Sequence, residues 1–504
     1  MDSRHAGLRP FVVFCVVIAS LGAMNNGFNT SSLNIPASAI RKCPGVPEGQ
    51  VTYYPNSPLP QCLPMGDWIW GVATGMFAIG GLLGAMMCGP MSQKFGRRDS
   101  MIIINISFFI GAILLSTSVH SAQFAIGRIF VGIGAGFMTV VISMYIAETS
   151  PPKYRGALGS FLQLFVTLGI LIIEAIGLGL TSAVGWRIVV VITVVPAIIQ
   201  MICLPFCARS PRWLINHNRI DEARLELLRL RKGDVEEEFA DILLNLSKGG
   251  GSKTAREKQQ QQGEQAHPSN DSQSEVSLTF WQVMSIRVLA ILTLKMMVVH
   301  MAGQLTGINA VMYYSTSIFE NSFGDDAKYV TVGVAGLNVF ITLIGLALID
   351  NLGRKKLLLI SSTGMCIFAT LITIGLRFNV GPLQVVCVML FVASYAVGLG
   401  MVPFIITAEV YPTYAVGAAS SAALMVNWLC NFIIGLVFPA LQSACGPYVF
   451  LIFTGITFFV TIFIIFFVPE TKQKSIEDLG RELGWAGLDT QAILAKANKN
   501  DHHK

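Results

Sequence analysis

Long apolar runs separated by short polar connections dominate the chain, and twelve of them approach the roughly 20 residues that a membrane-spanning helix needs. The runs are 11–31, 68–89, 100–119, 124–147, 158–181, 186–206, 288–319, 329–350, 356–376, 383–411, 414–440 and 446–468. Backbone groups inside lipid must be satisfied within the segment, so runs of this length predict helices. The pattern therefore predicts an all-α membrane protein with twelve transmembrane helices.

The runs fall into two related sets, six before the polar stretch 207–280 and six after it. Three landmarks recur at an offset of 261 residues: 147–151 (AETSP) as 408–412 (AEVYP), 156–157 (GA) as 417–418 (GA), and 208–212 (ARSPR) as 469–473 (PETKQ). A constant offset indicates two homologous halves, and hence two pseudo-symmetric six-helix bundles. In apolar proteins this arrangement is typical of transporters whose substrate lies between the halves.

The repeat divides the chain into five segments. They are an N-terminal bundle (1–206), a cytoplasmic helical segment (207–248), a disordered linker (249–279), a C-terminal bundle (280–468) and a cytoplasmic tail (469–504). Residues 211–247 carry an amphipathic helical pattern, which predicts short helices beside the membrane. The linker is mainly Gly, Gln, Ser and charged residues, which suits a spacer; a regulatory phosphorylation site is the alternative.

Composition and charge fit a lipid environment. Of 504 residues, 53% are hydrophobic and only 13% are charged, against about 25% charged in soluble domains. Lys and Arg concentrate in the loops after the second, fourth and eighth runs, which predicts that this side, with both termini and the central loop, is cytoplasmic. This bias accounts for the net charge of +6, so we expect a lipid bilayer as partner and no nucleic acid.

Enzyme and metal-site signatures are missing from the sequence. It has no P-loop, no nucleophile arrangement and no His/Cys cluster with metal-ligand spacing, so we expect no enzyme, no cofactor and no metal. Cys43 and Cys62 flank a polar loop on the non-cytoplasmic side, where either a disulfide or two free thiols fits.

Charges of both signs stand at the cytoplasmic helix ends of each half. They are Arg97, Arg98, Glu148 and Arg155 in the first half and Asp350, Arg354, Lys355 and Glu409 in the second. We expect these residues to form an ion-pair network when the cytoplasmic side closes; the alternative is a set of solvated topology signals. Val416 occupies the position that matches Arg155, so the second cluster has one cation fewer.

Several motifs, in order along the chain, carry a family resemblance. They are 27–30 (GFNT), 94–98 (KFGRR), 148–156 (ETSPPKYRG), 304–314 (QLTGINAVMYY), 427–428 (NW) and 469–472 (PETK). With them the chain resembles the sugar porters of the major facilitator superfamily over residues 10–475, most closely the facilitative hexose transporters and their fungal relatives. The resemblance implies a central sugar site and alternating access by rocking of the two bundles.

The resemblance also implies a set of sugar-binding residues. It points to Gln163, Gln304, Asn309, Asn338 and Asn427, to which we add Asn431 and Phe404. Amides suit a hexose because they donate and accept hydrogen bonds without charge, and an aromatic ring can pack on the apolar face of the sugar. For Gln163 and Asn431 the alternative is an ordinary hydrogen bond between helices.

Gating residues are expected beside these amides. Tyr313 and Tyr314 match residues that close the outer side of the family's site, although ordinary aromatic packing is the alternative. Gly398, Gly400 and Pro403 interrupt a span and predict a hinged gate or a static kink. Glycines at 303 and 307 predict a break near Gln304.

The chain departs from the family pattern at several positions. Phe404 replaces a frequent tryptophan, Ala396 and Arg209 replace glutamates, and Gly303 and His300 replace glutamines. His300 is a packed residue, a sugar contact or a pH-sensitive group. Glu174 stands within a span where the family commonly has glutamine, and an acid there is a functional hypothesis by default; the alternative is that it lies close to the outer water.

Three functions remain open at this stage. A passive hexose transporter is favoured because Asn29 stands where proton-coupled relatives carry Asp, and an amide cannot cycle a proton. A proton–sugar symporter, using Glu174 or His300, is the first alternative, and a non-transporting sugar sensor is the second. We expect a monomer in the plasma membrane or the vacuolar membrane.

Overall fold

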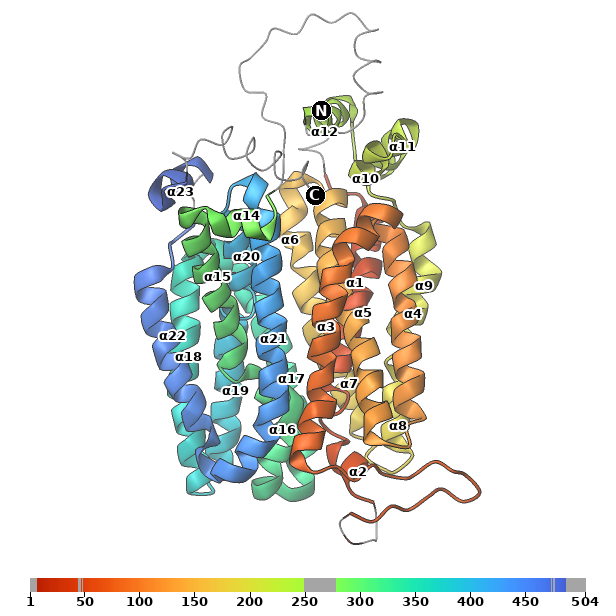
Figure 1. The fold of residues 1–504 in the computed structure, drawn as a ribbon, viewed down its shortest axis with the longest axis vertical. Helices are drawn as coiled ribbons and strands as arrows, with labels where there is room; N and C mark the ends of the chain where they lie inside the picture. Colours follow the sequence, from red (N-terminus) through yellow and green to blue (C-terminus); the bar gives the residue numbers. More distant parts are fainter. Residues whose placement is uncertain are drawn as a thin grey trace, which may run out of the picture.

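The computed structural model describes residues 7–43, 47, 49–248, 278–472, 474 and 476–485, and these residues are almost entirely helical (Figure 1). The first half contains α1 (Pro10–Ser31), α2 (Ala37–Arg41), α3 (Asp67–Phe95), α4 (Arg97–Ser116), α5 (Ser121–Thr149), α6 (Arg155–Gly159), α7 (Phe161–Gly177), α8 (Gly185–Ile192) and α9 (Val195–Cys203). The second contains α15 (Arg287–Leu305), α16 (Ile308–Phe323), α17 (Ala327–Leu352), α18 (Arg354–Arg377), α19 (Gly381–Val397), α20 (Val402–Glu409), α21 (Thr413–Cys445) and α22 (Val449–Phe467).

Eleven helical stretches among the described residues are long and apolar enough to cross a membrane, and the last, Ala415–Phe467, contains both α21 and α22. The helices stand side by side as two groups, α1–α9 and α15–α22 (Figure 1). β pairing within the described part is limited to one isolated bridge, between Tyr53 and Pro60. The predicted all-α fold with twelve crossings in two bundles is confirmed.

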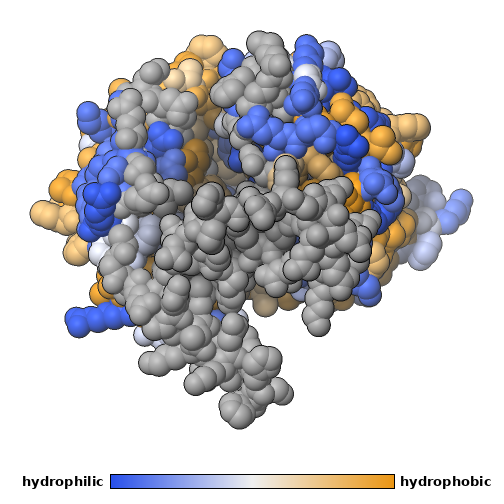
Figure 2. Space-filling model, turned by 90° about the horizontal axis from the view of Figure 1, so that it is seen from above, coloured by the Kyte–Doolittle hydropathy of each residue, from blue (hydrophilic) through white to orange (hydrophobic). Residues whose placement is uncertain are grey.

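The two ends of the bundles differ in chemistry, and we name them for it. The basic end carries Arg97 and Arg354 together with the short helices α10 (Pro211–Asn216), α11 (Ile220–Leu230), α12 (Glu236–Lys248), α14 (Phe280–Ser285) and α23 (Ile476–Leu483). Hydrophilic residues gather on this face, and hydrophobic ones show mainly around its margin (Figure 2). The disulfide end carries the bond between Cys43 and Cys62. Linker residues 249–277 lie outside the described part.

Four of the apolar runs are interrupted inside the bundles, and in the run 158–181 the break falls at Ser160, between α6 and α7. The run 288–319 breaks at Gly307, as its glycines predict, and the run 383–411 breaks between α19 and α20 at the Gly398–Pro403 segment. The run 186–206 forms one membrane span, as expected, but its helix is interrupted. It divides into α8 and α9 because Pro196 has no N–H to donate back along the helix.

Glycine lets helices of the first bundle touch backbone to backbone. A Cβ added to Gly80 would lie 2.1 Å from the carbonyl oxygen of Ile129, and one added to Gly84 would lie 2.0 Å from that of Ile133. Small residues at helix contacts are the usual way to gain close packing inside lipid, where no hydrophobic drive joins helices. α3 and α5 therefore form a rigid centre for this bundle.

Gly307→Ala tests the break in the second bundle. Gly307 has φ +97°, and an added Cβ would lie 2.6 Å from the ring of Phe453. We expect a loss of about 1–3 kcal/mol in stability from the left-handed backbone, plus the clash. Thermal unfolding of the purified chain measures it. Gly455→Ala is the control, because a Cβ there meets nothing within 4 Å and helical Ala is favoured. Equal unfolding temperatures for the two variants would contradict this account of the break.

Candidate functional site

Two predicted sugar contacts meet at the break between α15 and α16. Gln304 lies in the last turn of α15 and Asn309 in the first turn of α16, and both side chains are buried. The left-handed Gly307 turns the chain so that Asn309 Nδ2 donates to Gln304 Oε1. Each amide keeps further donor or acceptor capacity, so the pair can serve a polyhydroxylated ligand.

α21 brings two more of the predicted amides to the same place. Asn427 Nδ2 lies 3.4 Å from the carbonyl oxygen of His300 on α15, a long hydrogen bond. Asn431 Oδ1, one turn further on, accepts a 2.7 Å hydrogen bond from the hydroxyl of Tyr313 on α16. The neighbouring Tyr314 donates at 2.7 Å to the carbonyl of Gly435. Both tyrosines thus tie α16 to α21 beside the amides.

α20 completes this side of the site with an aromatic ring. Phe404 is 43% exposed, and its ring stands edge-on to His300 with the centroids 5.0 Å apart. His300 is buried, and its Nε2 lies 3.1 Å from the hydroxyl of Thr407. An exposed ring beside buried amides is the combination that a sugar face can pack on.

The α19–α20 break is held by the neighbouring helix. A Cβ on Gly398 would lie 2.3 Å from the carbonyl oxygen of Leu357 on α18, so only glycine fits there. The N–H of Leu399, freed from the helix, donates at 3.0 Å to the hydroxyl of Ser361. A Cβ on Gly400 would lie 3.0 Å from the ring of Tyr395. The interruption is therefore a built feature of α18–α20.

The other two predicted amides lie apart from this cluster. Gln163 is half-buried on α7 and Asn338 is buried on α17, and within the described part neither side chain is bonded to the cluster. Their helices do pack on each other, since a Cβ on Gly336 would lie 3.9 Å from Leu171. The described contacts thus join Gln304, Asn309, Asn427 and Asn431, and bring in Phe404 through His300.

The two bundles are in contact at the disulfide end and diverge toward the basic end. A Cβ on Gly71 of α3 would lie 2.1 Å from the backbone of Leu436 on α21. Gly89 lies on the same face of α3, because 18 residues make five helical turns, yet a Cβ there meets nothing within 4 Å. Gly156 and Gly417, which correspond in the repeat, are exposed near the basic end and are equally uncrowded. These three glycines near the basic end therefore face no neighbour, whereas Gly71 meets the opposite bundle.

The predicted ion-pair residues form mirrored pairs, one within each bundle. Arg97 donates at 2.7 Å to Glu148, whose other oxygen accepts from the hydroxyl of Ser210. Arg354 donates at 2.9 Å to Glu409, whose other oxygen accepts from Thr471 at 2.6 Å. Ser210 and Thr471 are themselves separated by the repeat offset. In this state the pairs strengthen each bundle separately.

The remaining residues of the expected network contribute unevenly. Arg98 bonds Asp99 at 2.8 Å, and Lys355 donates to the carbonyl of Ile465 at 2.9 Å. Arg155 is exposed and has no ion pair among the described residues. The side chain of Asp350 lies outside the described part.

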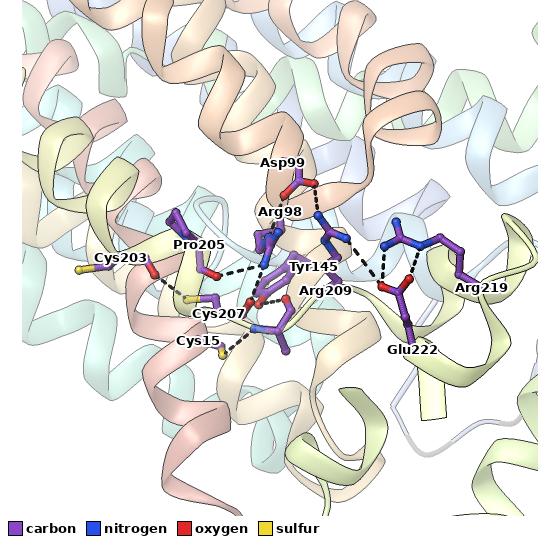
Figure 3. A network of polar contacts seen from close by, with 11 residues as sticks. Cys15, Arg98, Asp99, Tyr145, Cys203, Pro205, Cys207, Arg209, Arg219 and Glu222 are labelled. Carbon is purple, nitrogen blue, oxygen red and sulfur yellow. Dashed lines mark hydrogen bonds and ion pairs between the residues drawn. The ribbon is translucent and has the colours of Figure 1, made fainter. Parts of the chain in front are cut away.

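Arg209, a departure from the family pattern, has a clear role at the basic end. Its guanidinium lies 3.2 Å from Asp99 and 3.9 Å from Glu222 of α11, and Arg219 bonds the same glutamate (Figure 3). The hydrogen bond from Arg219 lowers the pKa of Glu222. This chain of charges attaches α11 to the first bundle.

Arg128 is a residue that the sequence analysis overlooked. It is fully buried on α5, donates at 2.7 Å to the carbonyl of Asn29, and lies over the ring of Phe77 at 4.7 Å. Its Nε and Nη2 have no partner among the described residues. A cation inside the fourth apolar run was the available signal, because charges within spans usually have a function.

Comparisons with known proteins agree with this arrangement. The family model described as "Sugar (and other) transporter" matches residues 14–483. The human facilitated glucose transporter member 3 is 33% identical over 484 residues, covering 94% of this chain and 92% of that protein. The sheep facilitated glucose transporter member 5 is 31% identical over 502 residues, covering 95% and 93%.

Solved structures share the fold. The xylose transporter XylE from E. coli, in a partially occluded inward-open conformation, matches with a TM-score of 0.71 at 22% identity over 93% of this chain and all of that one. The proton:xylose symporter XylE bound to 6-bromo-6-deoxy-D-glucose matches with a TM-score of 0.69 at 23% identity, over 94% and 99%. With the family model spanning both bundles, the chain belongs to the sugar transporter family and has the major facilitator fold.

Proposed function

We propose that this protein carries hexoses across a membrane by alternating access, as a passive transporter. The observation that carries the proposal is the neutral amide cluster at the break between α15 and α16, which a hydrogen bond from Asn427 joins to α21. The relatives described as facilitated glucose transporters support the hexose, and they are transporters rather than enzymes.

Neutral ligands suit a site that must release what it binds. A hydrogen bond between uncharged groups contributes about 1 kcal/mol net, so several of them hold a hexose at moderate affinity. Gln304, Asn309, Asn427 and Asn431 would bind hydroxyls, Phe404 would cover the ring, and Gln163 and Asn338 would join from α7 and α17 as the bundles close. A gate that moves when the sugar binds would be formed by Tyr313, Tyr314 and the Gly398–Pro403 break.

Passive transport is supported by the chemistry around Asn29. Its Nδ2 lies 2.9 Å from Asn25 Oδ1, and its backbone carbonyl accepts from Arg128. The amide cannot exchange a proton during the cycle, so Arg128 stays bonded to a backbone oxygen instead of pairing with a carboxylate. A sugar gradient alone would then drive transport.

The basic end would face the cytoplasm, because Lys and Arg are retained on that side of membranes. The described chain ends lie there: Arg9 bonds the carbonyl of Arg229, and Trp485 bonds that of Val410. We propose a monomer in the plasma membrane or the vacuolar membrane.

Counterflow of radiolabelled hexoses in proteoliposomes tests the function. The purified chain should accumulate labelled hexose against an internal unlabelled pool, and an imposed pH gradient should drive no additional net accumulation. Concentrative uptake that collapses with the pH gradient would establish a symporter instead. Binding of hexose without any flux would favour a sensor.

Gln304→Ala and Asn309→Ala test the site. Each substitution removes hydrogen bonds to a neutral hydroxyl, so we expect hexose affinity to fall about 3- to 10-fold per variant. Binding and counterflow of the purified variants measure this, with matched folding checked by thermal unfolding. Gln442→Ala, an amide on the same α21 but near the disulfide end, is the control. Unchanged kinetics in both site variants would remove this pair from the binding site.

A further inference from the structure

Glu174 is the one acidic residue of α7, and it is buried where the bundles meet. Its side chain is 3% exposed, close to the end of the helix that points to the disulfide end. The Oε1 atom accepts a 3.1 Å hydrogen bond from Nδ2 of Asn34, in the turn that follows α1. An acid in this position is unexplained by sugar binding, because the amide cluster lies on the other bundle.

Asn34 links this carboxyl to the opposite bundle. Its Nδ2 lies 2.8 Å from the hydroxyl of Ser315 and 3.2 Å from the carbonyl of Met312, while its Oδ1 accepts from the N–H of Thr316 at 3.2 Å. The amide thus has three acceptors around a nitrogen that carries two protons. An ionised Glu174 would draw that nitrogen away from the contacts that join the bundles.

Charged groups on the surrounding helices are directed elsewhere. Arg128 of α5 bonds the carbonyl of Asn29 and lies over Phe77. Arg187 of α8 donates to the carbonyls of Pro60 and Ser118.

The charged and titratable groups of the opposite bundle and of α1 are also directed away from Glu174. Tyr313 and Tyr314 of α16 donate to α21, and Lys328 of α17 lies over Tyr329 at 5.5 Å. α1 presents the hydroxyl of Ser31, which donates to Met312. Within the described residues, no cation faces Glu174.

A carboxylate buried without a cation costs several kcal/mol, and a proton removes that cost. We propose that Glu174 is a proton-binding site that locks the disulfide end shut: it takes up a proton from the disulfide side when that end is open and keeps it while the basic end is open. This role of Glu174 rests on the proposed transport function. It makes the proton a regulator of the transport cycle and not a transported ion.

The pH dependence has a definite sign. Protonated Glu174 is compatible with the closed disulfide end, so acid on that side favours the state seen here. As the pH on that side rises, the carboxylate needs water, and the state with the disulfide end open gains population. The pH at the basic end has no such effect, because the carboxyl is buried away from the water that enters there.

Reconstituted full-length chain with Glu174→Gln provides the test. We expect wild-type hexose counterflow to change several-fold with the pH on the disulfide side, and the Gln variant, which cannot ionise, to transport hexose with a flat profile. Glu320→Gln is the matched control, since that carboxyl is exposed near the same end and its loss should leave the wild-type profile intact. An enclosed pH-sensitive dye should report no acidification of the lumen when sugar is added outside.

Other results of this experiment would contradict either the role of Glu174 or the proposed transport function. A profile that survives Glu174→Gln, or that vanishes only in His300→Gln, would overturn the site. Sugar-induced acidification of the lumen that Glu174→Gln abolishes would show that the proton is transported. Absence of hexose flux in every chain, wild type included, would contradict the proposed function instead.

A second measurement needs no variant. Hydrophobic carbodiimides react with protonated carboxyl groups in apolar surroundings, so the wild-type chain at neutral pH should be labelled at Glu174 and not at Glu320, as read by peptide mass spectrometry. An unlabelled Glu174 would overturn the proposal.

Discussion

Everything in this structure depends on where the two bundles touch. Asn34 and Ser31 hydrogen-bond across to α16, Asp67 accepts from Ser443, and Gly71 brings α3 against α21, all near the disulfide end. Each such hydrogen bond contributes about 1 kcal/mol. A handful of them is comparable with the few kcal/mol that separate conformational states, so a ligand of moderate affinity can shift the balance.

Each bundle, by contrast, is tied strongly within itself. The Arg97–Glu148 and Arg354–Glu409 pairs, with Ser210 and Thr471 on the second carboxylate oxygens, repeat the same arrangement in both halves. α11 and α12 follow the first bundle, because Arg209 bonds Asp99 and Glu222 while Arg231 bonds Glu238 and the carbonyl of Thr149. Strong contacts within each bundle and weak contacts between the bundles allow the two bundles to rock as separate bodies.

Much of this could be predicted from the sequence. The apolar runs and the constant offset predict the bundles, and glycines at 307 and 398 predict the two breaks, because lipid and backbone geometry leave few alternatives. The break before Pro196 was missed because a proline two residues into a helix also fits a continuing span with a kink. The amides pointed to a sugar site through the family resemblance. Their spacing in the sequence alone could not predict the hydrogen bond between Asn309 and Gln304.

Apart from the Arg97–Glu148 and Arg354–Glu409 pairs, the partners of charged residues could not be predicted. Arg209 stood out only as a departure from the family pattern, yet it pairs with Asp99, a contact between residues 110 apart in the chain. Arg128 and the Asn34–Glu174 bond were equally inaccessible, since they depend on how α1, α5 and α7 face one another. Long-range polar contacts require the fold first.

The most direct test of the central claim is the distance across the basic end. Spin labels at Gly156→Cys and Gly417→Cys, in a chain with its reactive cysteines replaced, report this distance by pulsed electron paramagnetic resonance in proteoliposomes. The account predicts two distances, the longer one corresponding to the structure described here, with populations that hexose shifts. A single distance that hexose leaves unchanged would contradict alternating access between these bundles.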